Sequence, residues 1–247
     1  MKQLLLACSV LAIICTIAIP TSADTITDSF TGGINWSTWT YWGTTLPPAT
    51  VVGNNNRVEV TLGGVDPNAP YEPTTKAGLR FNPVITGNFI ATVDFNLIDW
   101  DPILPRGLRV GIEASYIGDV VRIGDPISPW NGNSYVVNFM GREAVTPAFT
   151  YSGSLMLKRF ADTIGGYYMD ATTNGDWVLI SEQEKFYAGP LNLAFGSWAH
   201  AEDASGRQIA FDNFTLTQHP VPEPSTMLLL GSGLAGLVGY GRRRITK

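Results

Sequence analysis

Hydrophobic and polar residues alternate through most of the middle of the chain. Between Phe89 and Leu97 the odd-numbered positions are apolar, and the even-numbered ones become polar after Ile90. The same period of two recurs from Leu108 to Ala114 and from Tyr135 to Phe139. Successive side chains of a strand point to opposite faces, so this alternation predicts strands with one buried face. No ten-residue stretch before position 225 has convincing helical periodicity.

Turn-forming residues separate these strands. Gly and Pro together account for 42 of the 247 residues and are spread between the strands. Asn174-Gly175 suits the positive φ angles of a type I′ turn, which predicts a hairpin with arms Tyr167–Ala171 and Trp177–Ile180. The polar stretch 182–184 is typical of a solvated loop. Many short antiparallel strands bury their apolar faces by packing as two sheets, so the predicted fold class is an all-β, two-sheet antiparallel sandwich.

The order of several short motifs gives this sandwich a more specific form. Asp28-Ser29-Phe30 opens the domain, Gly87–Phe95 and Ser152–Arg159 lie between, and Phe211–Thr217 closes it. This order resembles concanavalin A-like (laminin G-like) jelly rolls over most of residues 24–218. The resemblance implies a jelly roll whose first and last strands pair, and it carries little information about function.

The first 23 residues have the pattern of a signal peptide. Lys2 precedes an apolar run, Leu4–Ile19, and Thr21-Ser22-Ala23 supplies small residues at the positions that a signal peptidase reads. We therefore expect cleavage after Ala23 and export of the domain 24–218. An uncleaved transmembrane anchor is the alternative, although the apolar run is short for a span.

Charge and cysteine content narrow the functions open to the exported part. Both cysteines, Cys8 and Cys15, lie in the predicted signal peptide, so the rest of the chain has no disulfide. Five of the 16 basic residues lie outside 24–224 and all 21 acidic residues lie inside it, which gives that stretch a formal net charge of −10. Such an acidic domain is not expected to bind nucleic acid, and anionic membrane surfaces repel it.

Residues 219–247 differ in composition from the rest of the chain. Pro222-Glu223-Pro224 precedes the apolar segment 227–240, and Arg242, Arg243 and Arg244 follow. As a helix this segment would be about 21 Å long, which is short for a span of roughly 20 residues. The order of motif, apolar segment and basic cluster resembles the PEP-CTERM sorting signal of exported bacterial proteins.

This second resemblance implies a route of processing. An exosortase is expected to recognise Pro222, Glu223 and Pro224, to cleave nearby, and to release the protein toward the cell surface or the exopolysaccharide matrix. Before cleavage, a short helix over 227–240 and the arginine cluster, which acts as a basic stop, anchor the chain transiently in the inner membrane. A plain C-terminal membrane tail is the alternative.

The carboxylates do not form a recognisable catalytic pattern. The glucanase members of the jelly-roll superfamily carry two glutamates that flank an aspartate on one strand, whereas Glu113 has only Ser115 and Ile117 at the matching positions. His200 and His219 are the only two histidines. We therefore expect a non-enzymatic protein. The alternatives are a polysaccharide-active hydrolase or lyase with unrecognised carboxylates, and a purely structural surface protein.

Aromatic residues near the first strands are candidates for binding extracellular polysaccharide. On a strand, Trp36 and Trp42 would share one face while Trp39 and Tyr41 share the other, so one pair could stack on sugar rings. Trp130 lies in a predicted loop among polar neighbours. The alternative is that these rings belong to the core.

The jelly-roll resemblance also implies a structural calcium ion where the first and last strands meet. Asp212 matches the ligand position in the closing strand, and Asp28 would lie near it. Carboxylate oxygens suit calcium. The apolar alternation changes phase between Phe211 and Phe214, so Asp212 is also placed to bond a turn or bulge, and we favour the turn. No other cofactor is expected.

Overall fold

The computed structural model describes residues 23–43, 49–63, 75–99, 108–115, 117–124, 133–184, 189–199, 205–219 and 233. Asp24–Gln218 forms one compact unit, and Met1–Ala23 with His219–Lys247 forms a second. Apart from Ala23 and Gly233, which is helical, the predicted signal peptide, the Pro222–Pro224 motif, the predicted helix over 227–240 and the arginine cluster fall outside the described residues. No helix within the described ranges is long and apolar enough to cross a membrane.

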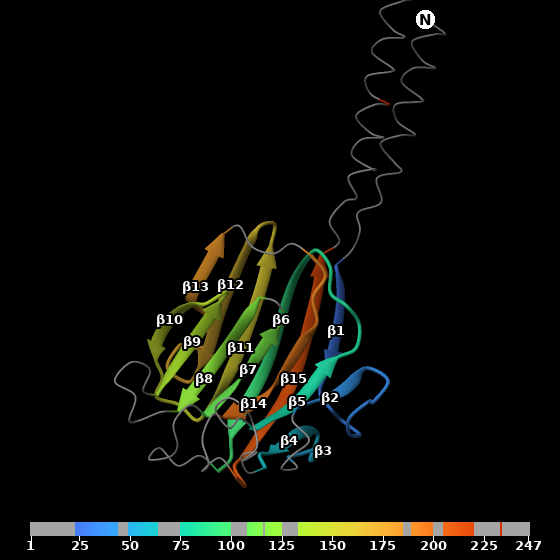
Figure 1. Cartoon of the computed structure of the whole chain (residues 1–247), viewed down its shortest axis with the longest axis vertical. Helices are drawn as coiled ribbons and strands as arrows, with labels where there is room; N and C mark the ends of the chain where they lie inside the picture. Colours follow the sequence, from blue (N-terminus) through green and yellow to red (C-terminus); the bar gives the residue numbers. More distant parts are fainter. Residues whose placement is uncertain are drawn as a thin grey trace, which may run out of the picture. The chain divides into compact units, whose positions relative to one another are not determined.

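In the described part of the chain, all strands pair antiparallel in two sheets that face each other (Figure 1). The eight-stranded sheet has the order β13 (Val178–Glu184), β12 (Thr163–Asp170), β11 (Ser152–Phe160), β6 (Asn88–Leu97), β15 (Gln208–His219), β4 (Arg57–Thr61), β3 (Thr50–Asn54), with β1 (Asp24–Asp28) beside β15. The seven-stranded sheet has the order β10 (Arg142–Pro147), β9 (Ser134–Phe139), β8 (Gly118–Gly124), β7 (Leu108–Ala114), β14 (Leu193–Ala199), β5 (Thr75–Phe81), β2 (Trp39–Gly43). The predicted two-sheet sandwich is therefore confirmed.

The first and last strands of the domain pair with each other. Asp24 faces Gln218 and Asp28 faces Phe214 in the register of β1 and β15. β15 also lies between β6 and β4, so the closing strand is central in its sheet. The pairing that the jelly-roll resemblance implied is confirmed.

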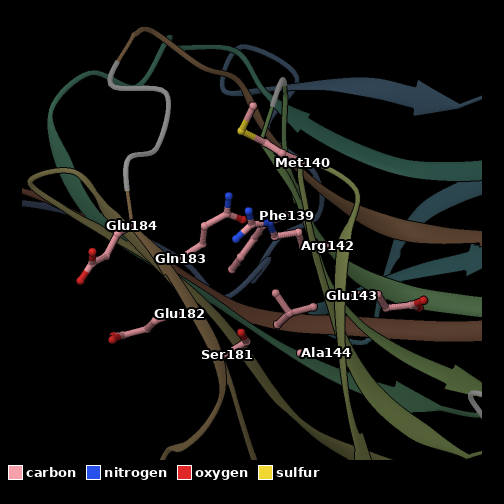
Figure 2. A pocket seen from close by; sticks show the side chains of 10 residues that line it. Phe139, Met140, Arg142, Glu143, Ala144, Ser181, Glu182, Gln183 and Glu184 are labelled. Carbon is pink, nitrogen blue, oxygen red and sulfur yellow. The ribbon is translucent and has the colours of Figure 1, made fainter.

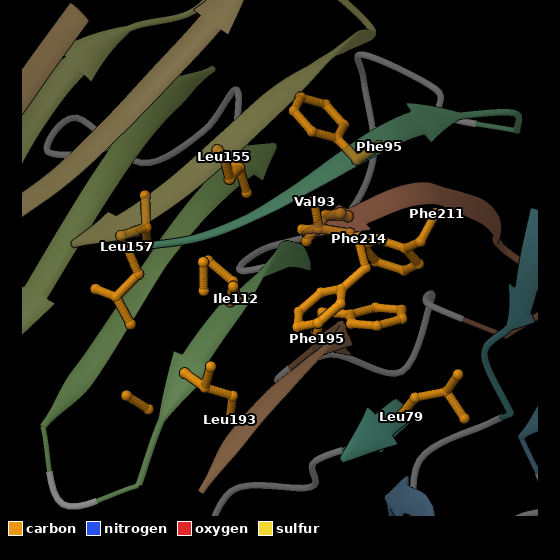
Figure 3. Close-up of a cluster of buried hydrophobic side chains, with 14 of the residues drawn as sticks. Leu79, Val93, Phe95, Ile112, Leu155, Leu157, Leu193, Phe195, Phe211 and Phe214 are labelled. Atoms are coloured by element: carbon orange, nitrogen blue, oxygen red, sulfur yellow. The ribbon is translucent and has the colours of Figure 1, made fainter. Parts of the chain in front are cut away.

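The core lies between the two sheets and contains the alternating apolar residues of both. Figure 3 shows Phe195 of β14 beside Phe211 and Phe214 of β15, and the ring centroids are 5.0 Å and 5.9 Å away from that of Phe195. Val93 of β6 and Ile112 of β7 are fully buried near them. Burying each such side chain stabilises the fold by about 1.5–3 kcal/mol, so this alternation is what selects the sandwich.

The structure corrects two predictions for residues 167–184. The stretch 182–184 is the end of strand β13 and not a loop. Its polar residues are tolerated because β13 is an edge strand with one side open to solvent. Asn174 and Gly175 do have positive φ angles, but β12 ends at Asp170 and β13 begins at Val178, so the connection is longer than the predicted hairpin.

Candidate functional site

A cleft opens along one side of the sandwich, between the edge strands of its two sheets. β10 ends one sheet and β13 ends the other, and the two strands are in contact. The cavity between them has a volume of about 750 Å³ (Figure 2). We call it the edge cleft, and its lining residues are Val137, Phe139, Met140, Arg142, Glu143, Ala144, Ser181, Glu182, Gln183 and Glu184.

Strand alternation decides which of these side chains enter the edge cleft. On β13, Gln183 points inward, whereas Glu182 and Glu184 point away from the cavity (Figure 2). On β10, Arg142 extends toward Gln183, and Glu143 points away on the other side. The interior of the cleft therefore presents an amide and a guanidinium, and the carboxylates of its three glutamates are directed away from it.

The floor of the edge cleft is apolar and its walls are polar. Val137 and Phe139 of β9 are buried beneath it. Within the described ranges, Oε1 of Gln183 is buried and has no hydrogen-bond partner, and the Arg142 side chain forms no ion pair. A buried polar atom without a partner is uncommon in proteins, so Oε1 of Gln183 is placed to bond a water or a ligand group. Arg142 is exposed, so its guanidinium is accessible to a polar ligand.

A second set of polar residues lies on the outer face of the seven-stranded sheet. In register across four strands, Glu143 faces Asn138, Asn138 faces Asp119, and Asp119 faces Glu113. The partner that Glu113 lacks along its own strand is therefore Asp119 on the next strand. Sequence spacing could not reveal this pair, because the register of β7 and β8 depends on the turn between them.

Asp119 is the most perturbed acid in the described part of the chain. Burial raises its pKa to about 7, the Arg109 guanidinium opposes that shift, and the neighbouring Glu113 carboxylate adds to it. Oδ1 of Asp119 and Nε of Arg109 are both buried without a hydrogen-bond partner among the described residues. At neutral pH the Asp119 carboxyl is therefore about half protonated, so it is able to act as a proton donor.

Lys76 links the carboxyl pair to two tryptophans on the same face. Its ammonium lies 3.3 Å from Oε2 of Glu113 and 3.6 Å from the ring centroid of Trp42. Trp42 in turn meets Trp198 edge to face at 5.7 Å. The ion pair and the cation–π contact together hold the Glu113 carboxylate beside Asp119.

The predicted aromatic platform does not form as a pair. Trp36 lies in a turn before β2 and is 56% exposed, so it does not share a strand face with Trp42. Trp39 and Tyr41 do share the inward face of β2, opposite Phe81 and Leu79, and Trp39 is fully buried. Trp42 is buried on the outer face. Trp130 lies outside the described residues.

The two predicted calcium ligands are engaged in local hydrogen bonds. Asp28 accepts the Phe30 amide through Oδ1 and the Trp39 indole N–H through Oδ2, at 2.8 Å and 2.7 Å. Asp212 accepts the amide of Asn213, whose φ of 48° marks the irregularity in β15. These uses of the oxygens favour the turn interpretation, and calcium binding stays a prediction.

The last part of the chain matches a family model. That model, described as the PEP-CTERM protein-sorting motif, covers residues 220–244. The chain carries a PEP-CTERM signal. The match includes Pro222, Glu223 and Pro224 and the three arginines at 242–244. The PEP-CTERM signal marks this chain as an exported protein that an exosortase processes. The chain matches no curated protein.

The domain ahead of the PEP-CTERM signal is similar in fold to solved lectin and glycosyl hydrolase structures. A lectin I-B4 from Griffonia simplicifolia in its metal-free form has a TM-score of 0.51 at 8% identity, and the alignment covers 78% of this chain and 98% of the lectin. A LamA variant from Zobellia galactanivorans, in complex with laminaritriose and laminaritetraose, has a TM-score of 0.53 at 12% identity, with 80% and 99% covered. A glycosyl hydrolase family protein from Mycobacterium fortuitum has a TM-score of 0.53 at 9% identity, with 77% and 98% covered. At these identities the likeness concerns the fold.

Proposed function

We propose that this exported protein binds glycan through the edge cleft, at the cell surface or in the exopolysaccharide matrix. The observation that carries the proposal is the inward arrangement of Arg142 and Gln183 over an apolar floor. Sugars present hydroxyls around rings whose C–H faces are apolar, so they need polar groups and an apolar surface together. The fold likeness to lectins supports the same conclusion as an analogy.

The size and position of the edge cleft suit a sugar chain. Its volume of about 750 Å³ lies within the range of about 300–1,000 Å³ that is usual for small-ligand sites. The cleft lies between β10 and β13, the strands that end the two sheets in the described part of the chain, so we expect a sugar chain to continue beyond the unit that is bound. The guanidinium of Arg142 can donate to two hydroxyls at once, and the Gln183 amide both donates and accepts.

The test is an oligosaccharide array followed by calorimetry on the full chain. We expect Gln183→Ala and Arg142→Ala each to weaken binding about tenfold, which corresponds to roughly 1.4 kcal/mol for a lost hydrogen bond to a charged or buried group. Gln218→Ala on β15 is the matched control and is expected to bind like the wild type. Absence of binding to any glycan, or equal affinity in all three variants, would refute the proposal.

A second candidate function is glycoside hydrolysis at Glu113 and Asp119. Directly opposed residues of antiparallel strands have Cβ atoms about 4.5–5.5 Å apart, and retaining glycosidases hold their carboxyl groups about 5–5.5 Å apart. In such a reaction the protonated Asp119 gives its proton to the glycosidic oxygen as the C1–O bond breaks. Glu113 then bonds C1, and water, deprotonated by Asp119, releases the sugar.

Release of reducing ends from neutral and acidic polysaccharides tests this second candidate. We expect Glu113→Gln and Asp119→Asn to abolish turnover and leave binding in the edge cleft unchanged. Asp162→Asn, at an exposed turn residue, is the control. If the wild type cleaves none of these polysaccharides, this second candidate function is refuted and the carboxyl pair has another role.

A further inference from the structure

A second hollow lies on the outer face of the eight-stranded sheet, directly across β13 from the edge cleft. It has a volume of about 220 Å³, large enough for about one sugar ring. We call it the outer hollow, and its lining residues are Lys158, Phe160, Thr163, Gly165 and Glu182. Glu182 also lines the edge cleft, so the two cavities share one wall.

A glycine forms the floor of the outer hollow. Gly165 faces Lys158 on one side and Glu182 on the other, so these two side chains stand two strands apart, or about 10 Å. A Cβ at Gly165 would lie 2.8 Å from the Tyr167 ring and 3.0 Å from Cγ of Glu182. The absence of a side chain at Gly165 therefore gives the Tyr167 ring and the Glu182 side chain room to pack over this part of β12, which sets the position of both.

The walls of the outer hollow are held in position by a hydrogen bond. The Tyr167 hydroxyl donates to Oε1 of Glu182 at 2.7 Å. Burial raises the pKa of Tyr167 to about 12, and the neighbouring Glu182 adds to that shift. The hydroxyl consequently keeps its proton at all physiological pH values, and the carboxylate of Glu182 stays fixed with one oxygen left for a ligand.

Phe160 supplies an apolar surface beside these polar groups. Its side chain is 61% exposed at the end of β11, opposite Thr163 of β12. Single exposed apolar side chains are common on protein surfaces, so it is the position of Phe160 in the lining of a polar hollow that makes it a candidate contact for a ligand. A sugar ring lying against Phe160 would present its hydroxyls to Lys158 and Glu182.

We propose that a glycan bound in the edge cleft continues over β13 and places a further sugar unit in the outer hollow. This inference rests on the proposed function. Figure 2 shows the Glu182 carboxylate directed away from the edge cleft, toward the outer side of β13, where the next unit would meet it. Lys158 and Glu182 carry opposite charges, so the outer hollow favours an uncharged sugar that bonds both side chains. The ligand class is therefore a neutral oligosaccharide of several units.

Chain-length dependence separates this inference from the function on which it rests. We would titrate the full chain with linear gluco-oligosaccharides of one to six units. Affinity is expected to rise about tenfold once the oligosaccharide is long enough to reach the outer hollow, because the second contact is then intramolecular. Phe160→Ala and Lys158→Ala should remove that rise and leave the binding of the short oligosaccharides unchanged, whereas Gln183→Ala should weaken all of them.

Phe149→Ala is the matched control, since Phe149 is a 79% exposed aromatic residue that does not line either cavity. Equal affinity for short and long oligosaccharides, or a full rise in the Phe160→Ala variant, would overturn the second subsite and leave the proposed function intact. Failure of every oligosaccharide to bind would instead remove the proposed function, and this inference with it.

Discussion

Asp119 illustrates how strongly a single residue depends on its neighbours across a sheet. Its carboxyl is buried on the outer face of the seven-stranded sheet, where Arg109 and Lys76 favour the charged form and Glu113 and Glu143 disfavour it. Burial dominates, so the pKa rises from 3.8 to about 7. The folded protein therefore destabilises the ionised form of Asp119 relative to the same carboxylate in water.

Because the pKa of Asp119 is raised in the folded chain, the free energy of unfolding falls as the pH rises. Between about pH 4 and pH 7 the folded chain holds a proton that the unfolded chain has released, so rising pH favours unfolding. We expect Asp119→Asn to unfold with a larger free energy than the wild type at pH 8, by up to roughly 4 kcal/mol, and with nearly the same value at pH 4. Urea unfolding at both pH values measures this difference.

The control for that measurement is Asp162→Asn, which changes an exposed aspartate in the turn between β11 and β12. It should leave the free energy of unfolding unchanged at both pH values. A gain for Asp119→Asn that is equal at pH 4 and pH 8 would show that ionisation is not its cause.

At the scale of elements, β2 shows why an aromatic-rich stretch is difficult to interpret from sequence. Trp39 packs at 4.8–5.8 Å between ring centroids against Phe30, Phe81, Phe195 and Phe214. That Trp39 and Tyr41 share one face of the strand was predictable, because side-chain alternation depends only on neighbouring residues. The position of Trp36 was not, because the strand begins only at Trp39 and the preceding residues form a turn.

This difference between the two tryptophans can be measured. We expect Trp39→Ala to lower the free energy of unfolding by about 3–5 kcal/mol, as for other buried aromatic residues. Trp36→Ala, at an exposed turn, should change it by less than about 0.5 kcal/mol. Thermal or urea unfolding of the full chain supplies both values. Comparable losses in the two variants would contradict the buried and exposed placements.

Edge strands were the elements that sequence patterns described least well. β13 carries Glu182 and Glu184 on its solvated side, so the region has the polar composition of a loop although its backbone pairs with β12. Local composition cannot separate the two cases, since hydrogen bonding to a distant strand decides them. The inward orientation of Gln183, which places it in the edge cleft, could be inferred only after β13 was known to be a strand.

At the scale of the molecule, the sandwich was predictable and the edge cleft was not. Alternation in β6, β7 and β9 indicates a buried face wherever those strands pair. The edge cleft exists because β10 and β13 end their sheets on the same side, which is a property of the strand order. The Glu113–Asp119 pair was not predictable for a similar reason, because its members are brought together only by the pairing of β7 with β8.

The PEP-CTERM signal gives a prediction for the whole protein in its cell. We expect the wild type to be recovered outside the membrane fraction with a mass that lacks the tail, because an exosortase cleaves near Pro222–Pro224. Glu223→Ala should remain full-length in the membrane fraction. Intact mass and fractionation of the native protein measure both. If the two forms are both full-length and membrane-bound, the tail is a plain anchor.

The central position of β15 sets the order in which this protein can mature. Without residues 208–219, β6 has no neighbour on that side, and β1 and the β3–β4 hairpin have no sheet to join. The sorting motif begins at residue 220, immediately after that strand. An exported chain therefore cannot complete its fold until it has been delivered as far as its own sorting motif. Chains interrupted earlier would expose unpaired strands to proteases, so completion of the sheet is expected to favour survival of full-length exported chains.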